Sequence, residues 1–454
     1  MENLFNLQVP EKILEIASEI RKAGGRAFLV GGFVRDVLLG NTDSRDFDIE
    51  VYDLEQESLL QILKSFGRTD IVGKAFGVFH LSMRGLSLDF SFPRTESKVG
   101  YGHRGFLVET NPKLTFKEAA YRRDFTINAM GMELPEMKLC DPYGGENDLK
   151  ERLLRHVGPA FSEDSLRILR GVQFASRFEL TLTQETIELC RTLSLSDLSI
   201  ERIFEEFKKW LLKPGKPSFG LKAFLDIGLE NYFPEILPLA SSFENLALLL
   251  DKMFEVRKEA FITEEAKTEL AFSALLAGNA FLKNKQGDEK AKIKENVLAF
   301  LNRITNEIHL IKKVPEILTV YGELDFETIP ADAVLRRYAV RLDGLSTLCS
   351  LVFSTPEHLI PNPLYAKEFF ERSSELNLLE EAPKPYLTGK MLLDLGMTPG
   401  KEMGKVIQES FELQLNGEIK NANEALEFAK KQISYFHLKS PVIPAGTAKT
   451  IIGI

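Results

Sequence analysis

The sequence predicts an α+β protein in which an N-terminal domain with a mixed sheet precedes a long run of helices. Short apolar segments typical of strands alternate with amphipathic helices up to about residue 150. From Asp148 onward the apolar residues recur at helical spacing, with almost none of the alternation that strands show. The chain also has 454 residues, too many for one ordinary hydrophobic core, so we expect several domains.

The elements of the N-terminal domain follow from apolar periodicity and from glycine breaks. A helix over residues 11–23 ends at Gly24-Gly25, and the strand RAFLV (26–30) is broken by Gly31-Gly32. The other expected elements are a short helix over 33–40, a strand over 46–52, a helix over 55–67, two strands within 78–92 that turn near Gly85, and a loop over 94–111.

Amphipathic segments after residue 150 predict a wholly helical remainder. Examples span 163–178, 184–194, 198–212, 264–277, 292–313 and 402–415, with breaks at 213–218, 283–290 and 354–363. We therefore expect a sheet-containing head (1–150), a helical neck (151–215), a helical body (216–320) and a helical tail (321–454).

Composition and charge narrow the class of protein. The chain is 44% hydrophobic and 27% charged, as ordinary globular proteins are. Its net charge of −9 argues against a protein that coats nucleic acid, so any RNA contact must be a local patch. Cys140, Cys190 and Cys349 are far apart in sequence, which argues against disulfides and zinc and favours the cytoplasm. No apolar run is long enough for a membrane helix, no targeting segment is apparent, and nothing indicates a protein partner.

The strand over 46–52 carries two aspartates on one face. Asp46 and Asp48 project together because residues two apart on a strand share a face, while Phe47 and Ile49 face the core. Two adjacent carboxylates repel each other unless a cation lies between them, and Mg²⁺ prefers such oxygen ligands. Asp89, on the polar face of the next strand pair, is a candidate third carboxylate. The alternative is the solvated face of an edge strand.

A glycine pair just before these aspartates favours the functional interpretation. Gly31-Gly32 separates a strand from a short helix and leaves backbone N–H groups open to phosphate oxygens. Arg35, one turn into that helix, adds a charged donor. A glycine pair alone fits any tight turn, but the pair followed by the two aspartates is a more specific pattern.

Four motifs in this order resemble a known family. VGGFVRDVLLG (30–40) with RDFDIEV (45–51) resembles the polymerase-beta-like nucleotidyltransferases. YRRDFTINAM (121–130), DPYGGENDLKERLLRHV (141–157) and EDSLRILRGVQF (163–174) narrow the resemblance to the bacterial-type (class II) tRNA nucleotidyltransferase and poly(A) polymerase family. Sparser matches at 201–212 and 392–407 extend it to the neck and tail. The resemblance implies that family's fold and a metal-dependent transfer of nucleotides to tRNA without a nucleic-acid template.

The resemblance also implies a nucleotide-binding set. Arg122, Arg123 and Asp124 would contact the triphosphate and ribose, although an arginine pair before a buried helix also fits a solvated helix terminus. The helix over 163–178 would bind the base, and its implied contacts are Glu163, Asp164, Arg167 and Arg170. The family often has a further arginine where this chain has Gln173, so the role of that position is open.

Asp164 and Arg167 are expected to act as a protein template for the base. Residues three apart share a helix face, so the alternative is a plain intrahelical ion pair. As a template, the carboxylate accepts from the amino group of cytosine or adenine, and the guanidinium donates to a ring acceptor. Guanine and uracil present the opposite pattern and would leave buried groups unpaired.

Residues 94–106 are similar in position to a flexible element that helps the family switch from C to A addition. The stretch contains Arg94, Glu96, Tyr101 and Arg104, and its composition also fits a plain surface loop. None of the six histidines is followed by Asp, so the metal phosphohydrolase domain of some members is not expected.

Taken together, these patterns predict an enzyme that adds C, C and A to the 3′ end of tRNA from CTP and ATP. Asp46 and Asp48 would hold Mg²⁺, and Asp89 would polarise the attacking hydroxyl. A poly(A) polymerase, or an enzyme of the same family that adds only part of CCA, is the closest alternative. A non-catalytic RNA-binding protein on the same scaffold is a more distant one.

Overall fold

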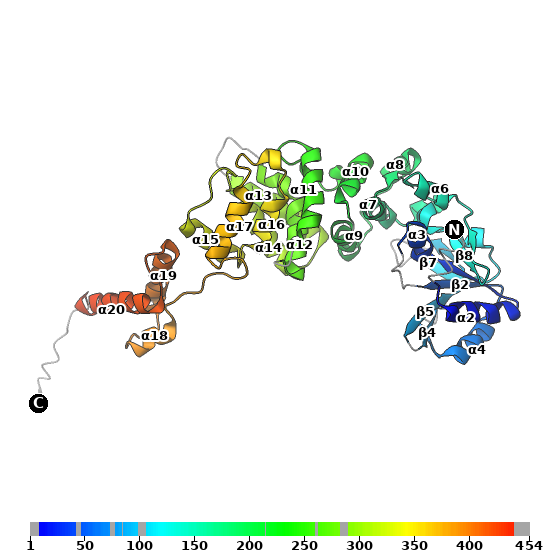
Figure 1. The fold of residues 1–454 in the computed structure, drawn as a ribbon, viewed down its shortest axis with the longest axis horizontal. Helices are drawn as coiled ribbons and strands as arrows, with labels where there is room; N and C mark the ends of the chain where they lie inside the picture. The colour runs from blue at the N-terminus through cyan, green and yellow to red at the C-terminus, as the bar shows by residue number, and fades with distance from the viewer. Residues whose placement is uncertain are drawn as a thin grey trace, which may run out of the picture.

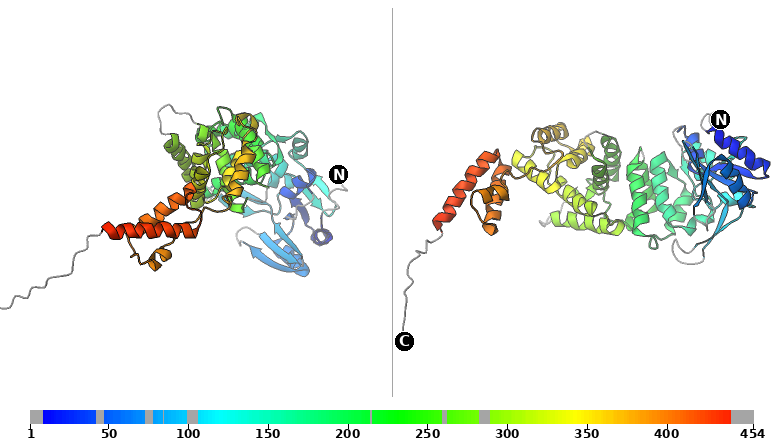
Figure 2. Two further views of the ribbon diagram at one scale, coloured as in Figure 1. Left: turned by 60° about the vertical axis from the view of Figure 1, so that its left-hand side comes forward. Right: turned by 90° about the horizontal axis from the view of Figure 1, so that it is seen from below.

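The molecule is elongated, with a sheet at one end and helices along the rest of its length (Figure 1). The computed structural model describes residues 9–41, 47–72, 78–83, 85–98, 106–213, 215–258, 262–281 and 289–439. Two further views show the same order along the long axis, from the blue N-terminal end to the red helix α20 (Figure 2). The predicted α+β class is confirmed. No helix of the described ranges is both long and apolar enough to cross a bilayer.

The head is built on one seven-stranded mixed sheet in the order β3-β4-β5-β2-β1-β8-β9. Its neighbouring strands are antiparallel except for β2 and β5, which run parallel because α4 and two strands intervene in the chain. The strands are β1 (Arg26–Val30), β2 (Asp48–Tyr52), β3 (Arg68–Val72), β4 (Val78–Met83), β5 (Leu86–Ser91), β8 (Gly131–Leu134) and β9 (Lys138–Cys140).

Both faces of this sheet are covered. Ile49 and Val51 of β2 join the main core, as the alternation predicts, together with the apolar faces of α2 (Glu11–Lys22) and α4 (Gln56–Phe66). Phe28 and Tyr52 point the other way and pack on Phe116 of α5 (Phe116–Ala120) in a second, smaller core. Burial on both sides holds the strands that carry the acidic side chains in a fixed register.

The predicted loop over 94–111 is wrong at both ends. Residues Arg94–Lys98 form β6 and residues Phe106–Thr110 form β7, and the two pair as an antiparallel hairpin from Arg94↔Thr110 to Lys98↔Phe106. The glycines that suggested a loop all fall between these strands in the sequence, within residues 99–105, which lie outside the described ranges. Tyr101 and Arg104 belong to that segment, and the side chain of Glu96 also lies outside the description.

The remainder is helical, apart from the two-residue strands β10 (Leu153–Leu154) and β11 (Thr181–Leu182). The helices between residues 145 and 375 are α6 (Gly145–Lys150), α7 (Leu166–Phe178), α8 (Gln184–Arg191), α9 (Ile200–Leu212), α10 (Pro217–Ile227), α11 (Phe243–Val256), α12 (Glu264–Leu275), α13 (Glu289–Ile304), α14 (Ile308–Tyr321), α15 (Asp332–Leu342), α16 (Ser346–Ser354) and α17 (Tyr365–Glu375). The single helix predicted over 292–313 is wrong. The chain breaks after Ile304, where the Thr305 hydroxyl accepts a hydrogen bond from Glu307 N at 3.1 Å in place of a helical partner.

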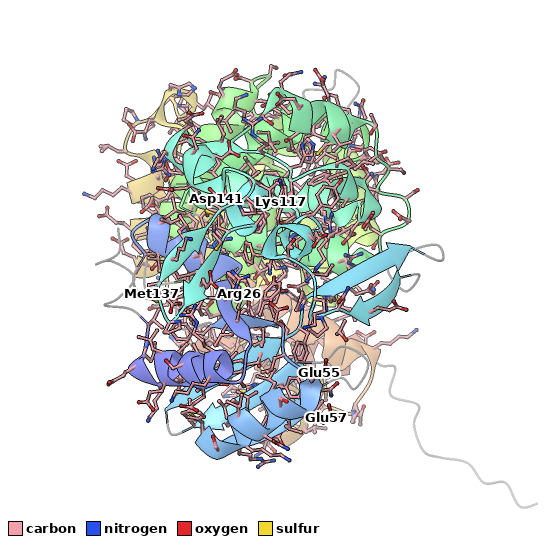
Figure 3. All side chains as sticks on the ribbon, turned by 90° about the vertical axis from the view of Figure 1, so that its right-hand side faces the viewer. Arg26, Glu55, Glu57, Lys117, Met137 and Asp141 are labelled. Carbon is pink, nitrogen blue, oxygen red and sulfur yellow. The ribbon has the colours of Figure 1, made fainter. Side chains whose placement is uncertain are left out.

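Helix α6, at the end of the head, begins where a carboxylate satisfies its first amides. Asp141, labelled near Lys117 in Figure 3, accepts from Gly145 N at 2.8 Å and from Glu146 N at 2.9 Å. The segment around Asp141 is one of the four motifs noted in the sequence. Its contacts are therefore structural, and they fix the first turn of α6.

The last three helices have a core of their own. Helices α18 (Gly389–Asp394), α19 (Lys401–Asn416) and α20 (Ala422–Lys439) enclose a cluster that includes Leu392, Val406 and Ala425, separate from the main core. Arg336 and Arg337 of α15, a helix of the main core, connect to it by donating to Leu415 O at 3.0 Å and to Asn416 Oδ1 at 2.8 Å. This apolar cluster supports a separate tail, whereas the expected domain boundaries remain predictions.

Candidate active site

A cavity of about 390 Å³ opens between the head and the first helices of the neck. The β1–α3 turn, the base of β6, the segment after α5, helix α7 and helix α9 all contribute to it. Its lining residues are Gly31, Gly32, Arg35, Arg94, Arg122, Arg123, Asp124, Asn128, Asp164, Leu166, Arg167, Arg170, Phe174 and Arg202. The sequence motifs that predict nucleotide binding therefore meet in one place, although they lie up to about 140 residues apart in the chain.

The glycine turn forms one wall of the cavity. Gly31 has φ 72° and ψ −133°, a conformation that residues with a side chain rarely adopt, and it precedes α3 (Gly32–Leu38). A β-carbon at Gly31 would lie 3.6 Å from Arg123 Nη1 and 3.7 Å from Asp48 Oδ2. The turn therefore brings bare backbone between a guanidinium and a carboxylate, as a site for a phosphate group requires.

Arg35 lines the cavity but is largely committed to the protein. Its side chain is buried, donates to Asp36 Oδ1 from Nε at 2.9 Å and to Asn128 Oδ1 from Nη1, and stacks on Phe178 with 4.2 Å to the ring centroid. Burial lowers the pKa of Arg35, and the Asp36 carboxylate opposes that effect. We therefore interpret Arg35 as a buried positive charge behind the glycine turn rather than as an extended phosphate ligand.

Two of the three predicted carboxylates are neighbours on the sheet. Asp48 and Asp89 are register partners across the parallel pair β2–β5, so their side chains share a face, and both residues are exposed. Their donor set of carboxylate oxygens fits a hard divalent cation. Asp46 lies outside the described residues. Within those residues, no three histidine, cysteine or acidic side chains gather closely enough to form a metal cluster.

A buried acid, Glu50, lies beside both arginines of the RRD segment and orients them. Glu50 of β2 lies 3.5 Å from Arg122 Nη2 and 4.0 Å from Arg123 Nη2 and accepts a hydrogen bond from the Tyr52 hydroxyl. Burial, followed by the nearby Glu50 charge, raises the pKa of Tyr52, which keeps the hydroxyl protonated as a donor. The sequence analysis gave Glu50 no role, so its contacts with the arginines were not predicted.

Asp124 is a buried anchor rather than an exposed ligand. It accepts from Arg170 Nε at 2.7 Å, from Asn128 Nδ2 at 2.9 Å and from Phe125 N at 2.8 Å. Burial alone would raise the pKa of Asp124, but the Arg170 charge and these hydrogen bonds hold it below its usual value. Asp124 thus fixes Arg170 at the cavity wall.

Asp164 lines the cavity, but not from the helix position that the sequence predicted. Helix α7 begins at Leu166, and Asp164 precedes it with extended backbone (φ −131°, ψ 105°). The helix starts late because Asp164 Oδ1 accepts from Leu166 N at 3.1 Å and so caps the first turn. Its other oxygen, Oδ2, accepts from Arg202 Nη2 of α9 at 2.8 Å.

Arg167 is fixed by two backbone carbonyls. Nη1 donates to Ala160 O at 2.6 Å and Nη2 donates to Arg122 O at 2.7 Å. A guanidinium has five N–H donors, so these two bonds set its plane and leave others for a ligand. The expectation that both residues lie on α7 is wrong for Asp164, and the alternative of a plain ion pair between the two does not form, since each is held by other groups. Both side chains nevertheless line the same cavity.

Two of the remaining sequence expectations lie away from the cavity. Glu163 ends the 3-10 turn Pro159–Glu163 and does not line the described cavity, and Gln173 is 2% exposed within α7 and does not line it either. Conversely, Arg202, Asn128 and Phe174 line the cavity although they were not predicted to. Asn128 lies within the motif 121–130 and Arg202 within the sparser match 201–212, but neither residue was singled out as a nucleotide contact.

The cavity is strongly electropositive in a protein of net charge −9. Seven of its lining residues are arginines and two are aspartates. Arginine forks bind phosphate oxygens in pairs, and walls of low polarizability strengthen that attraction. The cavity therefore suits a polyanion about the size of a nucleoside triphosphate.

Comparisons with known proteins agree with this geometry. The poly A polymerase head domain family matches residues 27–155. A multifunctional CCA protein of Pasteurella multocida is 36% identical over 293 residues, which are 59% of this chain and 67% of that protein. Its counterpart in Xylella fastidiosa (strain M12) is 40% identical over 218 residues, which are 46% of this chain and 50% of that protein. The matched region thus spans about half to two thirds of these relatives.

Solved structures share the fold along nearly the whole chain. A CCA-adding enzyme in complex with CTP superposes with a TM-score of 0.65 at 22% identity, covering 95% of this chain and 97% of that one. The Thermotoga maritima CCA-adding enzyme in complex with tRNA superposes with a TM-score of 0.62 at 22% identity, covering 95% and 98%. At this identity the likeness establishes the fold alone.

The fold and the site together define a nucleotidyltransferase. Enzymes of this class are generally metal-dependent. The chain belongs to the bacterial-type (class II) tRNA nucleotidyltransferase and poly(A) polymerase family.

Proposed function

We propose that this protein adds C, C and A in turn to the 3′ end of tRNA, using CTP and ATP and releasing pyrophosphate. One observation carries the proposal: Asp164 and Arg167 are locked by separate partners on the wall of an arginine-lined cavity. Such a cavity can hold a triphosphate and select its base at the same time. The names of the relatives, multifunctional CCA proteins, support the same activity.

The triphosphate is assigned to the glycine turn and the arginines beside it. Gly31 and Gly32 offer backbone N–H groups, and Arg122 and Arg123 offer guanidinium groups oriented by Glu50. Because these groups are held in place before the ligand arrives, binding loses little side-chain entropy. Arg170, held by Asp124, completes the positive wall near the neck.

The base is assigned to Asp164 and Arg167. An ionised carboxylate has about four acceptor sites, and Leu166 N and Arg202 Nη2 occupy one on each oxygen of Asp164. The remaining sites can accept from the amino group of cytosine or adenine, while free N–H groups of Arg167 donate to a ring acceptor. Uracil and guanine would place an N–H or a keto oxygen against a group of the same kind, at a cost of about 1–3 kcal/mol per unpaired group.

The three carboxylates Asp46, Asp48 and Asp89 are assigned to the metal and the attacking hydroxyl. Asp46 and Asp48 would hold Mg²⁺, which when bound neutralises charge on the transferring phosphate. Asp89, beside Asp48 in the sheet, would polarise the 3′-hydroxyl of the tRNA. Body and tail would hold tRNA by its shape and phosphates, and the cytoplasm is the compartment that we propose.

The experiment that tests the proposal supplies tRNA transcripts ending before, within and after CCA, with each nucleotide offered separately. We expect C on transcripts that lack both cytidines, A on transcripts that end in CC, and no extension after CCA. Incorporation of A alone on the CC end would identify an A-adding enzyme instead. Failure to extend any transcript would contradict nucleotidyl transfer to tRNA altogether.

A poly(A) polymerase is the second candidate, because the family that matches the head is named for that activity. The same cavity would serve it, since the arrangement of Asp164 and Arg167 accepts adenine. Long A tails on transcripts that already end in CCA, with ATP alone, would favour this candidate over CCA addition.

Deletion of residues 98–104 is expected to spare C addition and to impair the terminal A. The segment lies between β6 and β7 in the sequence, and Arg94 at the start of β6 lines the cavity. If it repositions the cavity for adenine, products stalled at CC will accumulate and will be visible at single-nucleotide resolution. Equal loss of C and A addition would show general damage instead.

Arg202→Gln is expected to lower the CTP-over-UTP preference by about three- to tenfold, the effect of about one ordinary hydrogen bond. The loss of Arg202 frees Asp164 Oδ2 and lets the carboxylate rotate away from the base. The ratio of kcat/KM values for the two nucleotides measures the change. Lys208→Gln, on the exposed side of the same helix beside Glu205, is the matched control. A parallel decline with both nucleotides would show that Arg202 does not set the base preference.

A further inference from the structure

His80, a residue that the proposed reaction does not use, lies directly beside Asp89. The two are cross-strand partners in β4–β5, so their side chains share a face, and His80 Nδ1 is 2.7 Å from Asp89 Oδ1. Asp89 is in turn the register partner of Asp48 across β2–β5. One row across three neighbouring strands therefore places the imidazole next to Asp89 and Asp89 next to Asp48.

Both nitrogens of the His80 ring have partners. Ser87 lies two residues before Asp89 on the same strand, hence on the same face, and its Oγ is 3.2 Å from His80 Nε2. An ionised carboxylate only accepts, so Nδ1 carries a proton toward Asp89, and Nε2 can accept from the Ser87 hydroxyl. These two bonds fix the tautomer and the plane of the ring.

The contact between His80 and Asp89 contributes little to the stability of the fold. The side chain of His80 is 36% exposed and that of Asp89 is 50% exposed, and pairs this open to water contribute little to stability. A half-exposed carboxylate without such a donor samples several rotamers. The hydrogen bond from His80 to Oδ1 restricts Asp89 to one rotamer and leaves Oδ2 to contact the 3′-hydroxyl of the tRNA.

We propose that His80 is a positioning residue for the transfer reaction and acts through Asp89. The inference rests on the proposed function. In that reaction the 3′ oxygen of tRNA forms the bond to the α-phosphorus, the bond from that phosphorus to pyrophosphate breaks, and pyrophosphate leaves with the electron pair. Asp89 takes the proton of the attacking hydroxyl. His80 keeps its own Nδ1 proton and donates it in a hydrogen bond, so that Asp89 is oriented before tRNA arrives.

The first test compares two substitutions of His80. Leucine has no donor, whereas the Asn side-chain amide can place an N–H near the position of Nδ1. We expect His80→Leu to lower the single-turnover rate of C addition by about tenfold with the Kd for CTP unchanged, and we expect His80→Asn to recover most of the rate. His309→Leu, which removes another exposed histidine beside an acid, on α14, is the matched control and should match wild type.

The second test asks whether His80 acts through Asp89. In an Asp89→Asn background the added His80→Leu change should have no further effect on the rate, because the carboxylate that it orients is gone. In metal-free protein, ¹⁵N spectra of the six histidines should show His80 as the Nδ1–H tautomer and should shift only that ring in Asp89→Asn.

The outcomes separate the two proposals. Wild-type protein that extends no tRNA would overturn the proposed function, whatever His80 does. Normal extension by wild type together with an unchanged rate in His80→Leu would overturn the role of His80 alone. Equal losses in His80→Leu and His80→Asn, additive losses in the double variant, or an Nε2–H tautomer would also overturn it.

Discussion

Asp48→Ala is expected to lower the single-turnover rate of C addition by about a thousandfold or more, the several kcal/mol that a correctly held metal contributes to phosphoryl transfer. Asp48 lies at the edge of the glycine turn and beside Asp89, so its loss removes the carboxylate nearest to the assigned phosphate site. We expect Asp46→Ala to have the same effect, although Asp46 lies outside the described residues.

The rate is best measured with saturating CTP on a tRNA that lacks CCA, and thermal melting should show that the fold is intact. Asp70→Ala is the matched control, because Asp70 of β3 is an exposed acid on the same sheet, in register with His80 of β4. It should leave the rate unchanged. A folded Asp48→Ala protein that works within tenfold of wild type would refute the metal assignment.

Asp164→Ala is expected to reduce CTP and ATP use and to permit measurable incorporation of UTP or GTP. The substitution removes the acceptor that demands an amino group and leaves Arg167 and Arg202 free to donate to keto oxygens. The lost discrimination should be of order 1–3 kcal/mol, or about one to two decades in relative efficiency.

The ratio of kcat/KM for CTP to that for UTP is the deciding measurement. Asp164 also caps α7 through Leu166 N, so Asp164→Ala carries a stability cost of about 1 kcal/mol that melting will reveal. Asp164→Asn retains an acceptor for that cap while replacing the charge with an amide, and it separates the two effects. A constant ratio with falling overall activity would reduce Asp164 to a structural partner of Arg202.

In the head, the sequence predicted the elements whose signals are local, and it did not predict β3, β8 or β9 of the same sheet. Alternating apolar residues and glycine breaks identified β1, α3, β2 and the β4–β5 pair, and the register that these strands adopt brings Asp48 and Asp89 together. Glycine content misled the prediction for 94–111, where two short strands flank the glycines. The break after Ile304 depends on one threonine hydroxyl, which periodicity does not detect.

At the site, motifs identified the residues but not their partners. Asp164 and Arg167 were expected on one face of a helix, yet Asp164 precedes α7, and the two side chains are held by Arg202, Ala160 and Arg122. Those partners come from other segments, and no spacing rule relates Arg202 of α9 to Asp164. Asp124 lines the cavity, and its contact with Arg170 was likewise not predicted. Motifs could predict which residues belong to the site. The partners that hold these residues could be found only in the tertiary structure.

The seven arginines of the cavity have a consequence for turnover. Positive charges held this close repel one another, so the empty cavity raises the free energy of the folded protein. A bound polyanion removes that repulsion, and the protein should therefore be most resistant to unfolding when loaded and least resistant just after release. Each departure of pyrophosphate returns the enzyme to its higher-energy form. That form is the one best disposed to take up the next triphosphate, and successive additions would each begin from it.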